Sequence, residues 1–238
     1  MARTNTLKNR TVYLLPEEAN DKALAMTSSV TSMALVAILL AHIDDIDNQK
    51  GQVETAAALA QRVLFKYEHE LEAIADIDFQ RAVFLGTGPY YGLAHEAHLK
   101  VQEMTDGQLI CKFDSFLGFR HGPKAVVNDR TLMVYFHSPD SHIRKYEDDL
   151  VESIIKEQKP AFTFAVCDSC NGSNEYDFVM NISPEKIEIQ EDYLMLVYLL
   201  PIQLFSIFKS IKLKLNPDSP SKSGAIHRVV QGVKIYDY

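Results

Sequence analysis

Short runs of β-branched and aromatic residues alternate with longer stretches of helical periodicity along most of the chain. Strands of a parallel sheet are covered on both faces, so their sequences are continuously apolar, and several of these runs have that character. The runs predict strands at Thr11–Leu15, Ala82–Leu85, Leu109–Phe113, Leu132–His137, Phe162–Val166 and Phe178–Ile182. Helical patterns predict helices near Ala23–Ile43, Val53–Ala75, Tyr91–Thr105, Ile143–Glu157 and Asp192–Leu213.

This regular alternation indicates an α/β fold with right-handed crossovers, and so a doubly wound parallel sheet flanked by helices. Gly51 and the charged residues around it separate the first strand–helix pair from the rest. From about Arg81 onward, the chain could form one self-contained α/β domain. A single strand cannot bury its edge alone, so the first pair is expected to pack on something else.

Composition and charge narrow the classes of partner. The chain has 238 residues, of which 47% are hydrophobic and 24% charged, a composition typical of soluble globular proteins. Its formal net charge of -8 argues against a nucleic-acid partner, because phosphate backbones need a basic face. Two apolar stretches, Ala34–Ile43 and Tyr193–Phe208, are too short or too interrupted for a membrane span of roughly 20 residues. We expect buried helices there and no membrane association.

The cysteines suggest a reducing compartment. Their number is odd, and the polar segment Met1–Arg10 lacks the apolar core of a signal peptide, which together predict a reduced, cytoplasmic protein. Cys167 and Cys170 form a lone C-x-x-C after a predicted strand. Without a second pair or spaced histidines, neither a zinc site nor a redox role is favoured. Two ordinary thiols are expected.

The first candidate for chemistry is a glycine turn, Gly86-Thr87-Gly88, between a predicted strand and a predicted helix. Glycine lets the backbone approach a ligand closely, and the start of a helix favours anions. Three interpretations stay open: a tight strand–helix turn, a loop that lines a sugar or phosphate, and a dinucleotide site with Asp114 on the ribose. The last is the weakest, because the glycine spacing is looser than G-x-G-x-x-G.

The second candidate lies on the helix that follows this turn. Glu96, Lys100 and Glu103 are spaced four and three residues apart, so they share one face, beside an apolar stripe. Spacing alone favours a solvated Glu96–Lys100 pair, worth about 0.3–0.5 kcal/mol. A carboxylate at the border of a buried face could instead have a raised pKa and shuttle protons.

Two further segments carry polar side chains in suggestive places. His121 stands between glycines in the basic loop Gly118–Lys124, and an imidazole that titrates near neutrality could open a sugar ring. Thr27, Ser28 and Ser29 lie near a predicted helix start. Capping explains such hydroxyls in most proteins, although the same cluster also suits a sugar hydroxyl or a phosphate.

Together these motifs resemble a known family. EAHLKVQE at 96–103 and GFRHGPK at 118–124 look like the second half of the galactosamine-6-phosphate deaminases, also described as tagatose-6-phosphate ketose/aldose isomerases, of the sugar isomerase (SIS) domain family. AMTSS at 25–29 and RVVQGV at 228–233 are similar to other signatures of this group. More distantly, the pattern resembles the isomerase domain of glucosamine-6-phosphate synthase. The resemblance runs along nearly the whole chain after Thr11.

The resemblance implies two SIS halves, each a five-stranded parallel sheet flanked by helices. Residues 1–50 would be a partial carboxy-terminal segment of the first half, and residues 51–238 the second SIS domain with its tail. The family's Ser-rich phosphate loop, S-x-S-G-x-[ST], does not occur in this sequence. A separate amino-terminal SIS half is therefore a candidate partner, and a homo-oligomer is expected.

The resemblance also implies roles. Glu103 would be the general base that moves a proton between C2 and C1 of a hexose 6-phosphate, and His121 would help to open the ring, supplied across a dimer interface. Glu96 and Lys100 would be active-site helix residues. The implied activity is amino-sugar deamination or aldose–ketose isomerisation without a metal or cofactor, and a non-catalytic sugar-phosphate-binding protein is the alternative. The implied substrate-binding residues are Thr27, Ser28, Ser29, Gly86, Thr87, Gly88 and Arg228.

Overall fold

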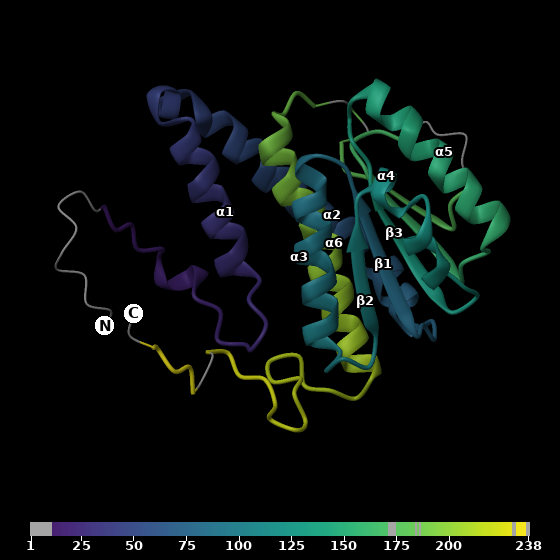
Figure 1. Cartoon of the computed structure of the whole chain (residues 1–238). Coiled ribbons are helices and arrows are strands. Elements are labelled where there is room, and N and C mark those ends of the chain that lie inside the picture. The colour runs from purple at the N-terminus through teal and green to yellow at the C-terminus, as the bar shows by residue number, and fades with distance from the viewer. Residues whose placement is uncertain (1–10, 171–174, 184, 186, 230–231, 237–238) are drawn as a thin grey trace.

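A five-stranded, entirely parallel sheet forms the centre of the molecule in the computed structural model (Figure 1). The structure describes residues 11–170, 175–183, 185, 187–229 and 232–236. The strand order is β2-β1-β3-β4-β5. The strands are β1 (Arg81–Gly86), β2 (Ile110–Asp114), β3 (Thr131–Phe136), β4 (Phe162–Cys167) and β5 (Phe178–Asn181). Five of the six predicted strands, and the doubly wound topology, are confirmed.

Helices cover both faces of this sheet, and each face has its own hydrophobic core. On one face, Phe84 and Val134 pack against α2 (Lys50–Asp76), α3 (Pro89–Met104) and α6 (Glu191–Lys212). On the other, Leu85 and Tyr135 pack against α4 (Phe116–Phe119) and α5 (Ser141–Glu157). Successive side chains of each strand point to opposite faces of the sheet, so both sets are buried, one in each core. This explains why the strand sequences are continuously apolar.

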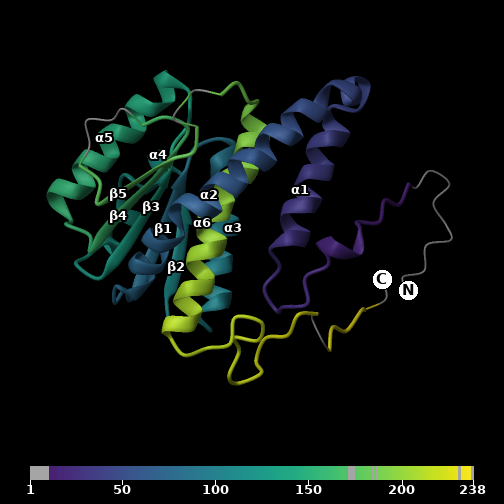
Figure 2. The same cartoon turned by 180° about the vertical axis from the view of Figure 1, so that it is seen from behind.

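The amino-terminal segment forms an arm beside this core (Figures 1 and 2). It contains a short 3-10 turn, η1 (Glu17–Ala19), and the helix α1 (Ser28–Ala41). A second 3-10 segment, η2 (Ile43–Gln49), joins α1 to α2, and the two helices are bent by 115° across this joint. Contacts such as that of the Gln203 side-chain amide with the Thr31 hydroxyl (3.3 Å) attach α1 to α6.

The predicted strand at Thr11–Leu15 is wrong. These residues have no regular structure, and Val12, Tyr13 and Leu14 are 72%, 68% and 82% exposed. A β-branched segment needs a neighbouring strand to pair with, and none of the strands in the described sheet lies beside it.

Helix α2 begins at Lys50 and takes Gly51 into its first turn. Leu59, Val63 and Leu71 of this helix are buried in the main core. Helix α2 therefore belongs to the same core as the sheet and the helices that follow Arg81.

Helix α6 is the one described helix that is long and apolar enough to span a membrane, and it is mostly buried. It packs against α2 and α3 with Pro201 inside it. The tail then runs past the carboxyl end of α3 (Figure 2).

Cys167 and Cys170 correct a further prediction, because they form a disulfide bond instead of two thiols. Cys111 is the free cysteine. The carboxyl end of β4 and the turn after it place the two sulfur atoms together, a proximity that a lone C-x-x-C does not reveal in sequence.

Candidate active site

A hollow of about 800 Å³ lies between α3, the residues that lead into α1 and the tail. We call it the α3 hollow. One side of α3 supplies Glu96, Lys100 and Glu103 to it, and the start of the arm supplies Met26 and Val30. The tail closes it with Ala225, Ile226, His227, Arg228 and Val229. Segments from both ends and the middle of the sequence therefore build one site.

The charged trio of α3 forms a continuous ion-pair network. The Lys100 ammonium lies 2.8 Å from a Glu103 carboxylate oxygen and 3.5 Å from a Glu96 oxygen. The Lys100 side chain is only 5% exposed, while those of Glu96 and Glu103 are 24% and 27% exposed. This is not the solvated surface pair that spacing alone favours, because the lysine between the two carboxylates is buried.

Burial raises the pKa of the Glu96 carboxyl, and the opposing attraction of the Lys100 ammonium does not cancel this effect. The neighbouring Glu103 carboxylate adds to the rise, because two like charges share one cation. Glu96 can therefore hold a proton at a higher pH than an ordinary glutamate. The trio offers a cation, a carboxylate bound to it, and a carboxyl with an increased affinity for protons.

The tail contributes a second cation and an imidazole to the α3 hollow. Arg228 lines it and donates a hydrogen bond to the Asn20 side-chain oxygen of the arm. Its neighbour His227, which sequence reasoning missed, lines the same hollow. A tail without periodicity gives no signal for such a residue, and only its adjacency to Arg228 could have drawn attention to it.

His121 lies apart from this hollow. It directly precedes the 3-10 turn η3 (Gly122–Val126) and is exposed. Its neighbour Phe119 packs in the core between the sheet and α5, whereas α3 packs on the opposite face. The Glu103 and His121 segments of one chain thus belong to opposite faces of the sheet.

The glycine turn also lies far from Glu103, at the other end of α3. Helix α3 has 16 residues, which at 1.5 Å per residue separates its ends by roughly 22 Å. A Cβ at Gly86 would meet the Tyr90 carbonyl oxygen at 2.1 Å, and Gly88 has a φ of 58°. Close helix–strand packing therefore explains Gly86, and a left-handed turn explains Gly88. Thr87 stands between them.

The hydroxyls at the start of α1 are engaged by Asp21. Its carboxylate accepts hydrogen bonds from the N–H groups of Thr27, Ser28 and Ser29, at 3.0, 3.1 and 2.8 Å. The hydroxyls of Thr27 and Ser29 also donate to it. Thr27 and Ser28 line a separate hollow with Gln203. Asp21, six residues before the N-cap residue Thr27, caps α1.

No family model matches the chain, but named proteins do. It is 34% identical over 231 residues to the D-galactosamine-6-phosphate deaminase AgaS of Shewanella sp. (strain ANA-3), covering 95% of this chain and 54% of that protein. It is 32% identical to the Escherichia coli protein of the same name, covering 97% of this chain and 59% of that one. The chain thus spans less than two thirds of the length of these relatives.

Solved structures agree with the sequence relatives. A protein of Clostridium novyi NT, provisionally named a tagatose-6-phosphate ketose/aldose isomerase, superposes with a TM-score of 0.91 and 35% identity, covering 96% of this chain and 59% of that one. The tagatose-6-phosphate ketose/aldose isomerase of Escherichia coli follows with a TM-score of 0.78 and 30% identity, over 92% of this chain and 58% of that one. The similarity extends through the arm, the sheet and the tail.

Proposed function

Because the chain belongs to the sugar isomerase (SIS) domain family, we propose that it acts on a sugar phosphate, as an isomerase or as an amino-sugar deaminase. The observation that carries this proposal is the Glu96–Lys100–Glu103 network beside Arg228 in the α3 hollow. The names of the relatives support a hexose 6-phosphate of the galactosamine or tagatose type as the substrate. We also propose that the protein is cytoplasmic.

In this proposal, Glu103 is the general base. Its carboxylate takes the proton from C2 of the open-chain sugar and returns it to C1, through an enediol or an enolamine. The Lys100 ammonium, 2.8 Å from Glu103, stabilises negative charge that develops on the sugar oxygen. Glu96, whose pKa is raised, is suited to hold the proton that this oxygen gains.

The same first step serves both reactions. From an aldose phosphate it gives the ketose phosphate directly. From an amino sugar it gives a ketimine, and water adds to that C=N bond and releases ammonia together with the ketose phosphate. Arg228 supplies a positive charge at the tail side of the hollow, suited to an anionic oxygen of the substrate.

We propose that His121 of a partner subunit opens the sugar ring. The reason is geometric: the segments that carry Glu103 and His121 pack on opposite faces of the sheet, so one chain does not bring them to one substrate. A homo-oligomer in which one subunit's η3 loop meets the other's α3 hollow would do so. His227 of the same chain is the alternative source of an imidazole, because it already lines the hollow.

The division into SIS units is also a proposal. Residues 51–238 would form the second SIS domain with its tail, and residues 1–50 the end of a first one. The greater length of the relatives supports a further SIS half, on a separate polypeptide or the same one, that would bring a phosphate-binding loop to the arm.

The test is ammonia release from galactosamine 6-phosphate, with tagatose 6-phosphate formation measured in parallel. Glu103→Gln should lower turnover by at least about 100-fold, because it removes the general base. Gln108→Ala, in the exposed turn after α3, is the matched control and should retain turnover. Turnover that survives in Glu103→Gln would contradict the assigned base.

The source of the imidazole is tested by mixing. His121→Asn and Glu103→Gln proteins, each inactive alone, should regain part of the activity when their subunits exchange, since a mixed oligomer holds an intact site. Failure of this rescue, together with inactivity of His227→Asn, would transfer the ring-opening role to His227 of the same chain.

The second candidate function is a sugar-phosphate-binding protein without turnover. The absence of an S-x-S-G-x-[ST] loop from the sequence is the observation in its favour. Thermal stabilisation by a hexose 6-phosphate, with no ammonia and no ketose formed, would favour it over the enzyme.

A further inference from the structure

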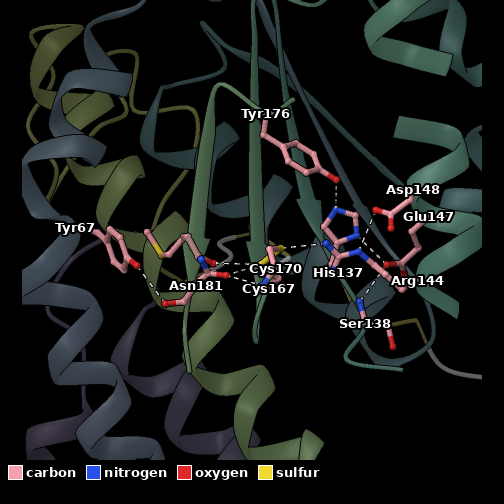
Figure 3. The surroundings of a disulfide bond; sticks show 11 residues. Tyr67, His137, Ser138, Arg144, Glu147, Asp148, Cys167, Cys170, Tyr176 and Asn181 are labelled. Carbon is pink, nitrogen blue, oxygen red and sulfur yellow. Dashed lines mark hydrogen bonds and ion pairs between the residues drawn. A yellow bond between two sulfur atoms is a disulfide. The ribbon is translucent and has the colours of Figure 1, made fainter. Parts of the chain in front are cut away.

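A disulfide stands at the carboxyl end of β4 (Figure 3). Cys167 is the last residue of β4 and is only 1% exposed. Cys170 lies three residues later and is partly exposed. The two sulfurs thus differ in access, since an outside thiol can approach Cys170 but not the buried Cys167.

A guanidinium group faces the more accessible sulfur. Arg144 of α5 places its Nη2 3.0 Å from the Cys170 sulfur, while its Nε donates to Asp148 at 3.1 Å (Figure 3). The Arg144 side chain is only 16% exposed, so water screens its charge weakly. A positive charge at this distance favours the thiolate over the thiol when Cys170 is reduced.

Buried contacts fix Arg144 in place by holding α5 against the sheet. A Glu147 carboxylate oxygen accepts a hydrogen bond from the Ser138 N–H and lies 2.9 Å from the His137 ring nitrogen Nδ1. The other ring nitrogen of His137 is 2.8 Å from the Tyr176 hydroxyl. Burial lowers the pKa of His137, despite the opposing hydrogen bond with Glu147, so Arg144 remains the positive group that faces the disulfide.

A hollow of about 260 Å³ lies beside the turn between the two cysteines. Asp168 and Ser169, the two residues between the cysteines, form part of its wall, and Arg144 forms another part. A thiol that enters this hollow would reach the turn that carries Cys170.

The disulfide is expected to contribute little to the stability of the fold. The entropy that a disulfide removes from the unfolded chain grows with the length of the loop it closes, and this loop is among the shortest. The domain also has a large core on each face of its sheet, of the kind that needs no cross-link.

We propose that Cys167 and Cys170 form a thiol–disulfide exchange site whose reaction partner is a dithiol. A thiolate of the dithiol attacks the Cys170 sulfur, the bond between the two cysteines breaks, and Cys167 leaves with the electron pair and takes up a proton. The second thiolate of the dithiol then attacks the dithiol sulfur that is bonded to Cys170 in the mixed disulfide. This step releases Cys170 as a thiolate beside Arg144. The dithiol loses two electrons and becomes a disulfide, and the protein disulfide gains them.

The surroundings favour a reversible reaction over local unfolding. The Asn181 side-chain oxygen accepts a hydrogen bond from the Cys170 N–H at 2.6 Å, and the Ser183 N–H donates to the Asp168 carbonyl oxygen. These bonds do not involve the sulfur atoms, so they hold the turn when the disulfide opens.

The first experiment titrates the disulfide in folded protein. A Cys111→Ala background removes the free thiol. The protein is equilibrated in buffers of reduced and oxidised dithiothreitol and then alkylated with a maleimide. Mass spectrometry counts the labels on each molecule. We expect no label in the oxidised buffers, two labels in the reduced ones, and the same midpoint from both directions. Labels that appear only after urea unfolding, or two labels in every buffer, would overturn the proposal.

Single-cysteine variants identify the attacked sulfur. Cys167→Ser keeps the accessible Cys170 and should form a mixed disulfide with oxidised glutathione at least about ten times faster than Cys170→Ser. Circular dichroism checks that both variants fold. If either variant does not fold, the dithiothreitol titration alone tests the proposal. Equal rates in two folded variants would contradict the assignment.

The role of the cation is tested in the Cys167→Ser background. Arg144→Gln should slow alkylation of Cys170 at pH 7 about fivefold or more, because the thiolate loses its neighbouring charge. Arg120→Gln is the control, since this arginine contacts the carbonyl oxygen of Tyr146 in α5 instead. These readouts measure thiols and not turnover, so they are independent of the proposed enzyme activity.

Discussion

Asp21 determines how helix α1 begins, although it lies six residues before Thr27. Partial desolvation raises the pKa of this carboxyl, but hydrogen bonds from Ser29, Ser28 and Thr27 outweigh that effect and lower the pKa from 3.8 to about 2. A carboxyl whose pKa is lowered by folding stabilises the folded state above its unfolded pKa. This contribution is lost as the pH falls from about 4 through about 2.

Replacement of Asp21 by alanine should therefore cost about 1 kcal/mol of unfolding free energy at pH 7, the usual value of a lost helix cap. Urea unfolding of the variant and the unchanged protein over a pH series measures this difference, which should narrow toward low pH. Glu18→Ala, at an exposed carboxylate in η1, is the control and should change little. A difference that is constant with pH would contradict the linkage to the carboxylate.

Replacement by alanine should change the stability in opposite directions at two glycines, Gly86 at the end of β1 and Gly92 inside α3. Gly86→Ala places a Cβ 2.1 Å from the Tyr90 carbonyl oxygen, which forces backbone to move and should destabilise the protein by about 2 kcal/mol or more. Gly92→Ala lies inside α3 with no atom within 4 Å of the new Cβ, and should be stabilising by up to about 1 kcal/mol. Denaturant midpoints of the two variants test this, and equal shifts would contradict it.

At the level of whole elements, one buried lysine joins the ends of two core helices. Lys209 of α6 donates to the carbonyl oxygens of Ala75 and Ile77 at the end of α2, at 3.1 and 2.6 Å. Burial lowers its pKa, against the attraction of Asp78 and Asp76. The last carbonyls of a helix lack partners within it, and here a neighbouring helix provides one.

Lys209→Met keeps the length of the side chain but removes these bonds, and should lower the unfolding free energy by about 2 kcal/mol, the cost of leaving buried carbonyls unpaired. Lys212→Met is the matched control, because it removes exposed ion pairs with Glu72 and Asp76 and should cost about 1 kcal/mol or less. Chemical denaturation measures the unfolding free energy of both variants. If Lys209→Met loses no more of it than Lys212→Met does, water satisfies the carbonyl oxygens in place of the ammonium.

Strands and helices whose own residues carry a clear hydrophobic pattern could be predicted from sequence. The five parallel strands and the five long helices all lie within a few residues of their predicted positions, because burial on both faces and helical periodicity are local patterns. The segment Thr11–Leu15 has the same local pattern as a strand, yet pairing depends on a neighbour that no local pattern encodes.

The site was predictable only in part. Glu96, Lys100 and Glu103 share a face by spacing, which fixed their juxtaposition in advance. Their burial, and the approach of His227 and Arg228, depend on where a tail without periodicity passes. The disulfide likewise depends on the path of a turn, and two cysteines three residues apart are compatible with either a bond or two thiols.

At the scale of the whole molecule, the arm and α2 expose several large apolar side chains. Leu40, Ile43 and Phe65 are 61%, 54% and 83% exposed. Such exposure is a feature of surfaces that bind other proteins. It agrees with the proposals of a homo-oligomer and of a further SIS half.

We therefore expect sedimentation velocity to show a dimer or a larger species. Phe65→Asp and Leu40→Asp should shift the distribution toward monomer, because a charge in an apolar interface loses its hydration. Lys50→Ala, an exposed residue between them in sequence, should leave it unchanged. A single sharp monomer for the unchanged chain would contradict the proposed self-association.

The 115° bend at Ile43–Gln49 divides the chain between an arm and a body that contains the complete described sheet with the helices of both its faces. His42 on one side of the bend is held to Asp192 at the start of α6 by a contact of 2.8 Å, so the arm is fastened by side chains as well as by the backbone. A break in the peptide chain inside the bend would leave both pieces with their contact surfaces intact.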